Sequence, residues 1–346
     1  MKYNEEYRAD LKRVLPFAGD KEMLRGKSVI ITGATGLICS AVVDILLEMN
    51  KTENAGIEII LAGRSEARLK ARFSYAADDK NLTYLPYDAT KTASYDDVKA
   101  DFIIHGASNA NPAAYVAQPV ETMQANFIGL DSLMKIAVNS NARKVLYVSS
   151  SEVYGQKNDM EPFGEEDYGY LDILNDRAAY PSSKRAAETL CIAYGNEYGI
   201  DTVIARPGHI YGPAVIPSDN RATAQFTRNA VNHEDIVMKS AGTQLRSYCY
   251  FLDCASAILT ILTKGEKGNA YNISNPASII TISAIARAIA NAAGMEIKFE
   301  NPDDAEAKGY SKMSNSSLKS EKLEALGWQA VFSPEEGALG CIKYFS

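Results

Sequence analysis

From Ser28 onward, short apolar runs rich in β-branched residues alternate with longer stretches of helical periodicity. This alternation is typical of a parallel sheet built from βαβ units. The apolar runs predict strands at Ser28–Thr32, Glu58–Ala62, Leu82–Pro86, Phe102–His105, Lys144–Ser149 and Thr202–Arg206. Helices are predicted between them, among others at Leu37–Met49, Val120–Asn139 and Ala179–Tyr198. The pattern therefore predicts an α/β fold with a doubly wound parallel sheet.

The two ends of the chain depart from this pattern. Residues 1–26 read as an amphipathic but weakly capped helical extension, which we expect to pack outside the core. Residues 27–207 carry all the predicted strands and form the predicted main domain. After Arg206-Pro207, turn residues, an apolar helix near Thr223–Val231 and an aromatic segment at Tyr248–Leu252 interrupt the alternation. We therefore expect residues 208–346 to form mainly a smaller lobe, interleaved with returns to the main domain.

Charge and hydropathy narrow the classes of partner. The formal net charge is −7 and the pI is near 5.2, and no run of Lys and Arg suited to a phosphate backbone is present. Nucleic acid is therefore not an expected partner. No apolar run approaches the roughly 20 residues that cross a bilayer, and the start of the chain lacks a signal peptide's apolar stretch. We expect a cytoplasmic protein with no membrane association.

Cysteine and histidine usage argues against disulfides and metals. The five cysteines form no C-x-x-C pair, which disfavours a disulfide framework and a structural zinc site. The three histidines are widely spaced, without a second ligand at metal-binding spacing. No metal is expected in the mechanism.

A glycine turn follows the first predicted strand directly and opens a helix. Glycines in this context let a pyrophosphate approach the backbone N–H groups at the helix N-terminus. We expect a dinucleotide, NAD or NADP, to bind there, which makes the main domain Rossmann-type. The residues concerned are Gly33, Thr35, Gly36, Leu37 and Ile38. Cys39 stands where a third glycine usually packs the helix on the strand, and its thiol is expected to push the helix slightly outward.

The end of the second strand bears on the choice of cofactor. An acid that would hold the adenosine ribose of NAD is missing there, and Arg64 stands in its place. A guanidinium can pair with a 2′-phosphate, so the sequence modestly favours NADP; the alternative is that Arg64 only caps the exposed end of the strand. Asp88, two residues past the third strand, is placed to receive the adenine amino group, or it is a plain turn residue.

Tyr180 and Lys184 are spaced four residues apart on one predicted helix, so their side chains share a face. We expect Lys184 to lower the pKa of Tyr180 and to hold the nicotinamide ribose, which would make the phenol a base near neutral pH. Ser150, at the carboxyl end of the fifth strand, is positioned to hydrogen-bond the same substrate hydroxyl. The three residues predict oxidation of a substrate hydroxyl beside the cofactor.

From about Ser28 to Pro276 the chain resembles the extended short-chain dehydrogenase/reductase enzymes that modify nucleotide sugars, and within them it is most similar to UDP-glucuronate decarboxylases. The resemblance is carried by Ser150-Ser-Glu-Val-Tyr-Gly155 and by the run from Arg177 through Tyr180 and Lys184 to Thr189. The segments from His105 to Ser108, with Tyr115, and from Gln244 to Asp253 also match.

The resemblance implies a reaction and a set of site residues. It implies cofactor contact by Ala107 and binding of a nucleotide-diphosphate sugar by Ser108, Tyr115, Arg177, His209, Arg221 and Arg246. Oxidation at C4 of a glucuronate places a ketone β to the C5 carboxylate, so CO2 can leave before the hydride returns. Glu152 and Ser151 are the candidates for orienting the carboxylate and handling the proton.

Other reactions of the same family stay open. A 4-epimerase needs only the Tyr, Ser and Lys set and room for the sugar to rotate. The 4,6-dehydratases of the glucose type carry an aspartate where this chain has Ser151, which cannot protonate a leaving hydroxyl at neutral pH. Dehydratases of the GDP-mannose type carry Thr-Ser-Glu there and favour NADP, which Arg64 also favours. A non-catalytic NADP-binding sensor is the alternative from another class, although Tyr180 and Lys184 are both present.

Two further expectations follow from the resemblance. His209 replaces the asparagine that decarboxylases carry before their Gly-Pro turn, which leaves the identity of the nucleotide open. Enzymes of this kind commonly dimerise through the helix bearing Tyr180, and small apolar residues on it suit either close pairing or packing on the sheet. These residues are Ala186, Ala187, Leu190 and Ala193.

Overall fold

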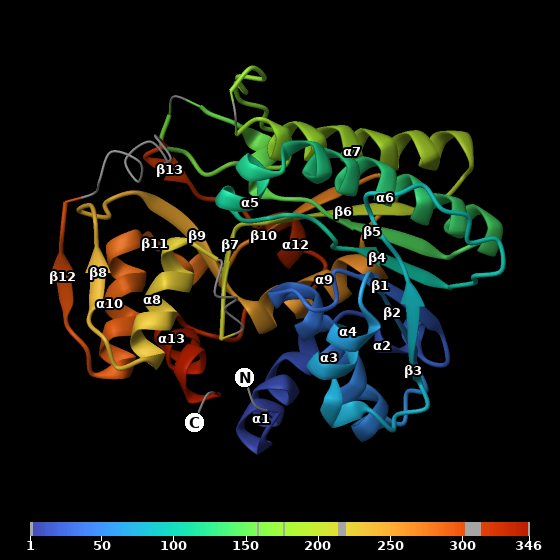
Figure 1. Cartoon of the computed structure of the whole chain (residues 1–346), viewed down its shortest axis with the longest axis horizontal. Coiled ribbons are helices and arrows are strands. Elements are labelled where there is room, and N and C mark those ends of the chain that lie inside the picture. Colours follow the sequence, from blue (N-terminus) through green and yellow to red (C-terminus); the bar gives the residue numbers. More distant parts are fainter. Residues whose placement is uncertain (1–2, 158, 176, 214–218, 302–312, 345–346) are drawn as a thin grey trace.

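A seven-stranded parallel sheet forms the centre of the computed structural model, which describes residues 3–157, 159–175, 177–213, 219–301 and 313–344 (Figure 1). The strands, in spatial order, are β10 (Ala270–Ile273), β6 (Thr202–Pro207), β5 (Lys144–Val148), β4 (Phe102–His105), β1 (Ser28–Thr32), β2 (Glu58–Gly63) and β3 (Leu82–Pro86). The doubly wound parallel sheet predicted from the sequence is confirmed, and the six predicted strands agree with the structure to within one residue.

The seventh strand, β10, lies far along the chain and was missed by the sequence pattern. It pairs in parallel with β6, with Tyr271 opposite Ala205. Its segment Ala-Tyr-Asn-Ile is short and contains Asn272, which breaks the apolar run. Asn272 is nevertheless fully buried, because its side-chain oxygen accepts a hydrogen bond from the Tyr154 hydroxyl.

Successive side chains of a strand point to opposite faces of the sheet, so each strand contributes to two hydrophobic cores. In β1, Val29 and Ile31 enter one hydrophobic cluster and Ile30 enters the other. Helices α3 (Leu37–Glu53) and α9 (Phe251–Lys264) cover the first face, and α6 (Pro119–Ser140) and α7 (Ala179–Glu197) cover the second (Figure 1). The predicted helices are therefore confirmed with small changes in their bounds.

The N-terminal segment is part of the core, so the prediction that it packs outside is wrong. It forms α1 (Glu5–Val14), η1 (Leu15–Phe17) and α2 (Lys21–Leu24), and Asn4 caps α1 by accepting from the Tyr7 N–H. Tyr7, Leu11 and Val14 are fully buried in the larger cluster. An amphipathic pattern shows that a helix has an apolar face but does not show what covers that face.

Two buried carboxylates on α3 hold α1 in place. The Tyr7 hydroxyl donates to Asp44 Oδ2 at 2.6 Å, and Arg8 Nη2 donates to Glu48 Oε1 at 2.9 Å. At the other end of α1, Arg13 pairs with Glu336, so the helix joins α3 to the last helix of the chain. Side chains of α1 therefore help to satisfy the buried carboxylates of α3, and Arg72 also pairs with Asp44 at 2.8 Å.

The second half of the chain builds a smaller unit on the left of Figure 1. Its sheet contains β7 (His209–Tyr211), β9 (Leu245–Tyr250), β11 (Ile279–Thr281) and β13 (Asn315–Ser316), and β8 (Ile236–Met238) pairs with β12 (Ile297–Phe299). Helices α8 (Ala222–Val231), α10 (Ile282–Ala293) and α13 (Pro334–Lys343) pack beside them. The aromatic segment Tyr248–Leu252 is the end of β9 and the start of α9.

Short elements complete the connections: α4 (Glu66–Arg72), η2 (Ser74–Ala76), α5 (Pro112–Ala117), η3 (Ser151–Tyr154), η4 (Pro276–Ser278) and α12 (Glu321–Glu324). In the described part of the chain, no helix has the length and apolar character needed to cross a membrane.

Candidate active site

The turn between β1 and α3 needs a glycine at its first position. Gly33 has a φ of +67°, and a Cβ at this position would lie 2.6 Å from the Gly106 carbonyl oxygen. Gly36 is the N-cap of α3 and supplies no side-chain cap, so backbone N–H groups at Leu37 and Ile38 are available to a ligand. Thr35, in the same turn, is exposed. The arrangement suits a pyrophosphate at the start of a long helix.

Thr32, which the sequence reasoning missed, fixes this turn to the end of β4. Its Oγ1 accepts hydrogen bonds from the N–H groups of Gly106 and Ala107, both at 3.1 Å. A Cβ on Gly106 would lie 2.3 Å from Cys39 Sγ. The Cys39 thiol therefore fits against the end of β4 because Gly106, which it faces, has no side chain. The sequence could have indicated this contact, because Thr32 is a polar residue at the end of an otherwise apolar predicted strand.

Arg64 and Asp88 lie at the ends of the neighbouring strands β2 and β3. Arg64 directly follows β2 and is exposed. Asp88 Oδ1 accepts from the N–H of Thr90 at 3.0 Å and from its hydroxyl at 2.8 Å. Burial raises the pKa of Asp88, but the bonds from Thr90 and the charges of Lys91 and Arg64 outweigh it, so the net shift is downward. A cation and an ionised carboxylate thus share the edge expected for the adenosine.

Tyr180 and Lys184 project from α7 toward the end of β5. Lys184 Nζ donates to the Val148 carbonyl oxygen at 2.7 Å, and the Tyr180 phenol is hydrogen-bonded to Ser150. The Tyr180 ring stacks on Tyr115 of α5 with centroids 5.1 Å apart. The structure therefore brings the predicted Tyr, Ser and Lys together at one strand end.

Burial dominates the electrostatics of these groups. Burial lowers the pKa of Lys184 to about 7, whereas Glu188 raises it. Burial also raises the pKa of Tyr180 above its usual value, and the bond with Ser150 and the charge of Arg221 act in the opposite direction. The net shift of Tyr180 is thus opposite to the lowering predicted from the sequence, because the desolvation of a phenol in this pocket outweighs the nearby positive charge.

Glu152 and Ser151 begin the short helix η3 directly after Ser150. The Glu152 side chain is open to solvent. Even so, desolvation by the surrounding protein raises the pKa of its carboxyl, while the charges of Arg177 and Arg246 act in the opposite direction. A carboxyl flanked by two guanidinium groups therefore faces the same space as Tyr180.

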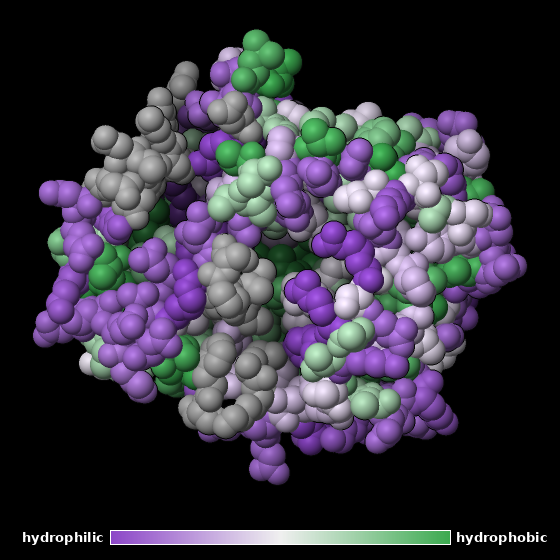
Figure 2. Space-filling view, viewed as in Figure 1, coloured by the Kyte–Doolittle hydropathy of each residue, from purple (hydrophilic) through white to green (hydrophobic). Residues whose placement is uncertain are grey.

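The remaining predicted substrate residues come from both halves of the chain, and the charges of Arg177 and Arg246 act on Glu152. Arg177 Nη2 donates to the Tyr115 hydroxyl at 3.0 Å. Arg246 is buried on β9, where its Nη1 donates to the Leu245 carbonyl and its Nη2 to the Met313 carbonyl. The Ser108 hydroxyl is buried with no hydrogen-bond partner among the described residues. Figure 2 shows a recess near the centre of this face, close to the position of β7 in Figure 1.

His209 and Arg221 differ in their partners: a ring nitrogen of His209 has no hydrogen-bond partner among the described residues, whereas Arg221 is paired with a carboxylate. Burial, together with Arg246 and Arg221, lowers the pKa of His209 to about 3, so the imidazole is neutral. Its Nδ1 has no partner in the described part of the chain. Arg221 instead forms a forked ion pair with Asp219, with Nη2 to Oδ2 at 2.6 Å. The sequence could have indicated this ion pair, because Asp219 stands two residues before Arg221.

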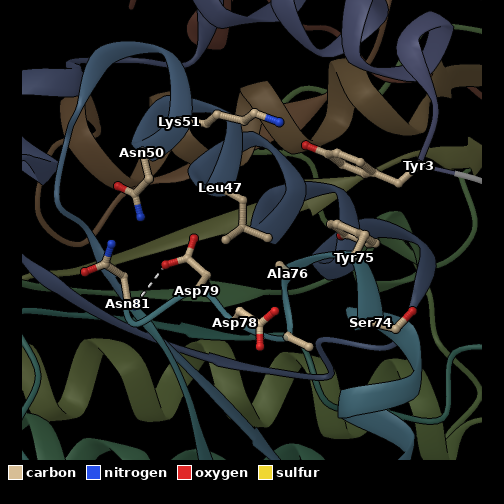
Figure 3. Close-up of a pocket in the computed structure, with 11 residues that line it drawn as sticks. Tyr3, Leu47, Asn50, Lys51, Ser74, Tyr75, Ala76, Asp78, Asp79 and Asn81 are labelled. Carbon is tan, nitrogen blue, oxygen red and sulfur yellow. Dashed lines mark hydrogen bonds between the residues drawn. The ribbon is translucent and has the colours of Figure 1, made fainter.

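A cavity also lies away from this space, on the far end of α3. It has a volume of about 340 Å³ and is lined by Tyr3, Leu47, Asn50, Lys51 and residues of the segment from Ser74 to Asn81 (Figure 3). None of the predicted site residues lines it. Among the described residues, no group of three or more His, Cys, Asp or Glu side chains could hold a metal ion.

Comparison with known proteins agrees with this geometry. Residues 29–274 match the model of the NAD dependent epimerase/dehydratase family. The chain belongs to this family. The predicted resemblance to nucleotide-sugar enzymes of the short-chain dehydrogenase/reductase type is confirmed, as is the prediction of an NAD-dependent enzyme. The preference for NADP suggested by Arg64 stays a prediction.

Curated relatives match most of the length of this chain. A UDP-glucuronic acid decarboxylase 6 of Arabidopsis thaliana is 30% identical over 93% of this chain and 90% of its own length. A UDP-glucuronic acid decarboxylase 1 of Xenopus tropicalis is 28% identical over 92% of this chain and 72% of its own.

Solved structures share the fold at lower identity. A UDP-glucose 4-epimerase of Thermotoga maritima has a TM-score of 0.76 and 22% identity, covering 92% of this chain and 98% of its own. A dTDP-glucose 4,6-dehydratase of Streptomyces venezuelae, solved with NAD bound, has a TM-score of 0.77 and 21% identity, covering 92% and 96%. These similarities confirm the fold of this chain.

Proposed function

We propose that this enzyme oxidises a nucleotide-linked hexuronate at C4, releases CO2 from C5 and returns the hydride, as in the conversion of UDP-glucuronate to UDP-xylose. The observation that carries the proposal is the group of Tyr180, Ser150 and Glu152 around one space, with Arg177 and Arg246 beside the carboxyl. The long match to UDP-glucuronic acid decarboxylases supports it.

In this proposal Tyr180 takes the proton from the C4 hydroxyl, and Ser150 holds the same oxygen by a hydrogen bond. The turn of Gly33 and Gly36, together with Lys184, would hold NAD, which would supply a reversible hydride acceptor for C4. The C5–C6 bonding pair passes into the ketone to form an enolate, and Glu152 or Ser151 directs the proton that C5 then receives. Tyr180 returns its proton to the C4 oxygen, so the cycle closes without net redox change.

The cations of the space suit a substrate with three negative charges. Arg177 and Arg246 would bind carboxylate or diphosphate oxygens, and Arg221 would do so from its pair with Asp219. His209 offers a neutral imidazole to the same ligand. Ser108 and Tyr115 would contact the sugar. In this view residues 27–207 bind the cofactor, and residues 208–346 mainly bind the nucleotide sugar.

The test is incubation of the purified protein with NAD and UDP-glucuronate, followed by mass spectrometry and proton NMR. A UDP-pentose formed with loss of CO2 supports the proposal. An unchanged mass with galacturonate signals would replace it with a 4-epimerase, and conversion only of neutral nucleotide hexoses would replace it with a 4,6-dehydratase.

A matched pair of tyrosine variants ties turnover to the site. Tyr180→Phe removes the phenol that is bonded to Ser150, and turnover should fall by roughly 100- to 10,000-fold, the range for loss of a general base. Tyr198→Phe removes an exposed phenol just beyond the same helix and should leave turnover unchanged. Equal activity of both variants would contradict the assigned role of Tyr180.

We also propose that the enzyme forms a homodimer through α6 and α7. Val120, Met123 and Phe127 are exposed at one-turn intervals on α6, which packs beside α7. Light scattering after size exclusion should give twice the chain mass, and Phe127→Asp should give the monomer. A monomeric wild type would refute this.

All five cysteines are free and buried, which is compatible with the proposed cytoplasmic location.

A further inference from the structure

Three consecutive residues at the end of β5 bind three side chains of α7 that lie one turn apart. The Val148 carbonyl accepts from Lys184, the Ser149 hydroxyl donates to Glu188 at 2.6 Å, and Ser150 bonds Tyr180. Two of these contacts involve the expected catalytic residues. The third involves Glu188, to which the mechanism above gives no role.

Glu188 is held by a buried ion pair. Arg206 of β6 donates from Nε to Oε1 at 3.0 Å and from Nη2 to Oε2 at 2.7 Å. Arg206 is 3% exposed and Glu188 8% exposed. Arg206 Nη1 also donates to the Tyr154 hydroxyl at 3.1 Å. A forked, buried pair of this kind fixes both side chains in one geometry, and breaking it leaves an unpaired charge.

The surroundings of Lys184 explain why this carboxylate matters. Cys39 of α3, Cys191 of α7 and His105 of β4 face the ammonium, with the rings of Tyr147 and Tyr180 over it. Burial raises the pKa of both thiols and lowers that of His105, so these three groups are uncharged near neutral pH. Glu188 therefore supplies the negative charge that opposes desolvation of Lys184.

We propose that Glu188, locked by Arg206, is a positioning residue that keeps Lys184 charged and holds α7 in register with the end of β5. Its place in catalysis rests on the proposed function, but its effect on Lys184 can be measured by cofactor binding alone. Lys184 should attract the negatively charged NADH only while it carries its own charge.

The test is fluorescence titration of the full-length protein with NADH between pH 5.5 and 9, a range that brackets about 7, the pKa of Lys184. In the wild type, affinity should be highest at low pH and fall as the pH rises through this value. In Glu188→Gln the midpoint of the fall should move down by about one pH unit, because an opposing charge close by is lost. Glu188→Asp keeps the charge and should restore the midpoint.

Two further variants make each outcome decisive. Lys184→Met should abolish the pH step, which identifies Lys184 as its origin. The double variant Glu188→Gln/Arg206→Met removes the unpaired buried arginine, so it should fold and still show the lowered midpoint. An unchanged midpoint in either folded Gln variant overturns the proposal, and so does failure of both to fold, since the pair is then only a fold element. Absence of sugar turnover with the NADH shift present would instead refute the proposed function.

Discussion

Leu11→Ala tests directly whether α1 belongs to the core. Leu11 is fully buried in the larger hydrophobic cluster, between Tyr7 and Val14 on the same helix face. The next residue, Lys12, is exposed on the same helix. Lys12→Ala is therefore a control, because it makes the same replacement by alanine at the neighbouring position, outside the core.

The expected magnitude follows from burial. Replacing a fully buried leucine with alanine removes its transfer free energy and leaves a cavity, which together cost about 2–5 kcal/mol. At about 3 kcal/mol, the ratio of folded to unfolded protein falls more than a hundredfold. Lys12→Ala should change the free energy of unfolding by less than about 0.5 kcal/mol, since alanine is a good helix former.

The assay is equilibrium unfolding in urea followed by the fluorescence of Trp328, the single tryptophan of the chain. Trp328 is fully buried and donates its indole N–H to Ser256 Oγ at 3.0 Å, so it reports loss of the same core. Leu11→Ala should lower the urea midpoint clearly, and Lys12→Ala should not. Equal midpoints for Leu11→Ala and the wild type would show that α1 is a peripheral extension after all.

Three other outcomes follow from the cofactor and substrate sites. Gly33→Ala should reduce NAD affinity more than tenfold in calorimetric titration, because its Cβ would clash with the Gly106 carbonyl; Gly26→Ala has a similar φ of +65° but open space around it, and a comparable loss there would contradict this reasoning. Arg64→Gln should weaken NADP binding at least tenfold and leave NAD binding nearly unchanged, and parallel losses would remove Arg64 from the 2′-phosphate site. Ser151→Asp should raise KM for UDP-glucuronate about tenfold or more by like-charge repulsion, and an unchanged KM would place the substrate carboxylate elsewhere.

The sequence by itself determined six of the seven strands of the main sheet and the cofactor end of the site. Apolar runs of four to six residues predict strands well when each is buried on both faces, as in β1 and β5. The glycine turn before Leu37 and the four-residue spacing of Tyr180 and Lys184 are local signals, because one turn or one helix contains each of them. Ser150 was also predictable, since it directly follows a predicted strand.

Only the tertiary structure decided what meets across the chain. The packing of α1 depends on Asp44 and Glu48, which lie far from it in sequence, and no local pattern specifies such a partner. The same holds for β10 beside β6 and for the pair of Arg206 with Glu188. The pKa of Tyr180 was predicted with the wrong sign because charge can be read from neighbouring residues, whereas desolvation depends on everything that closes over the phenol.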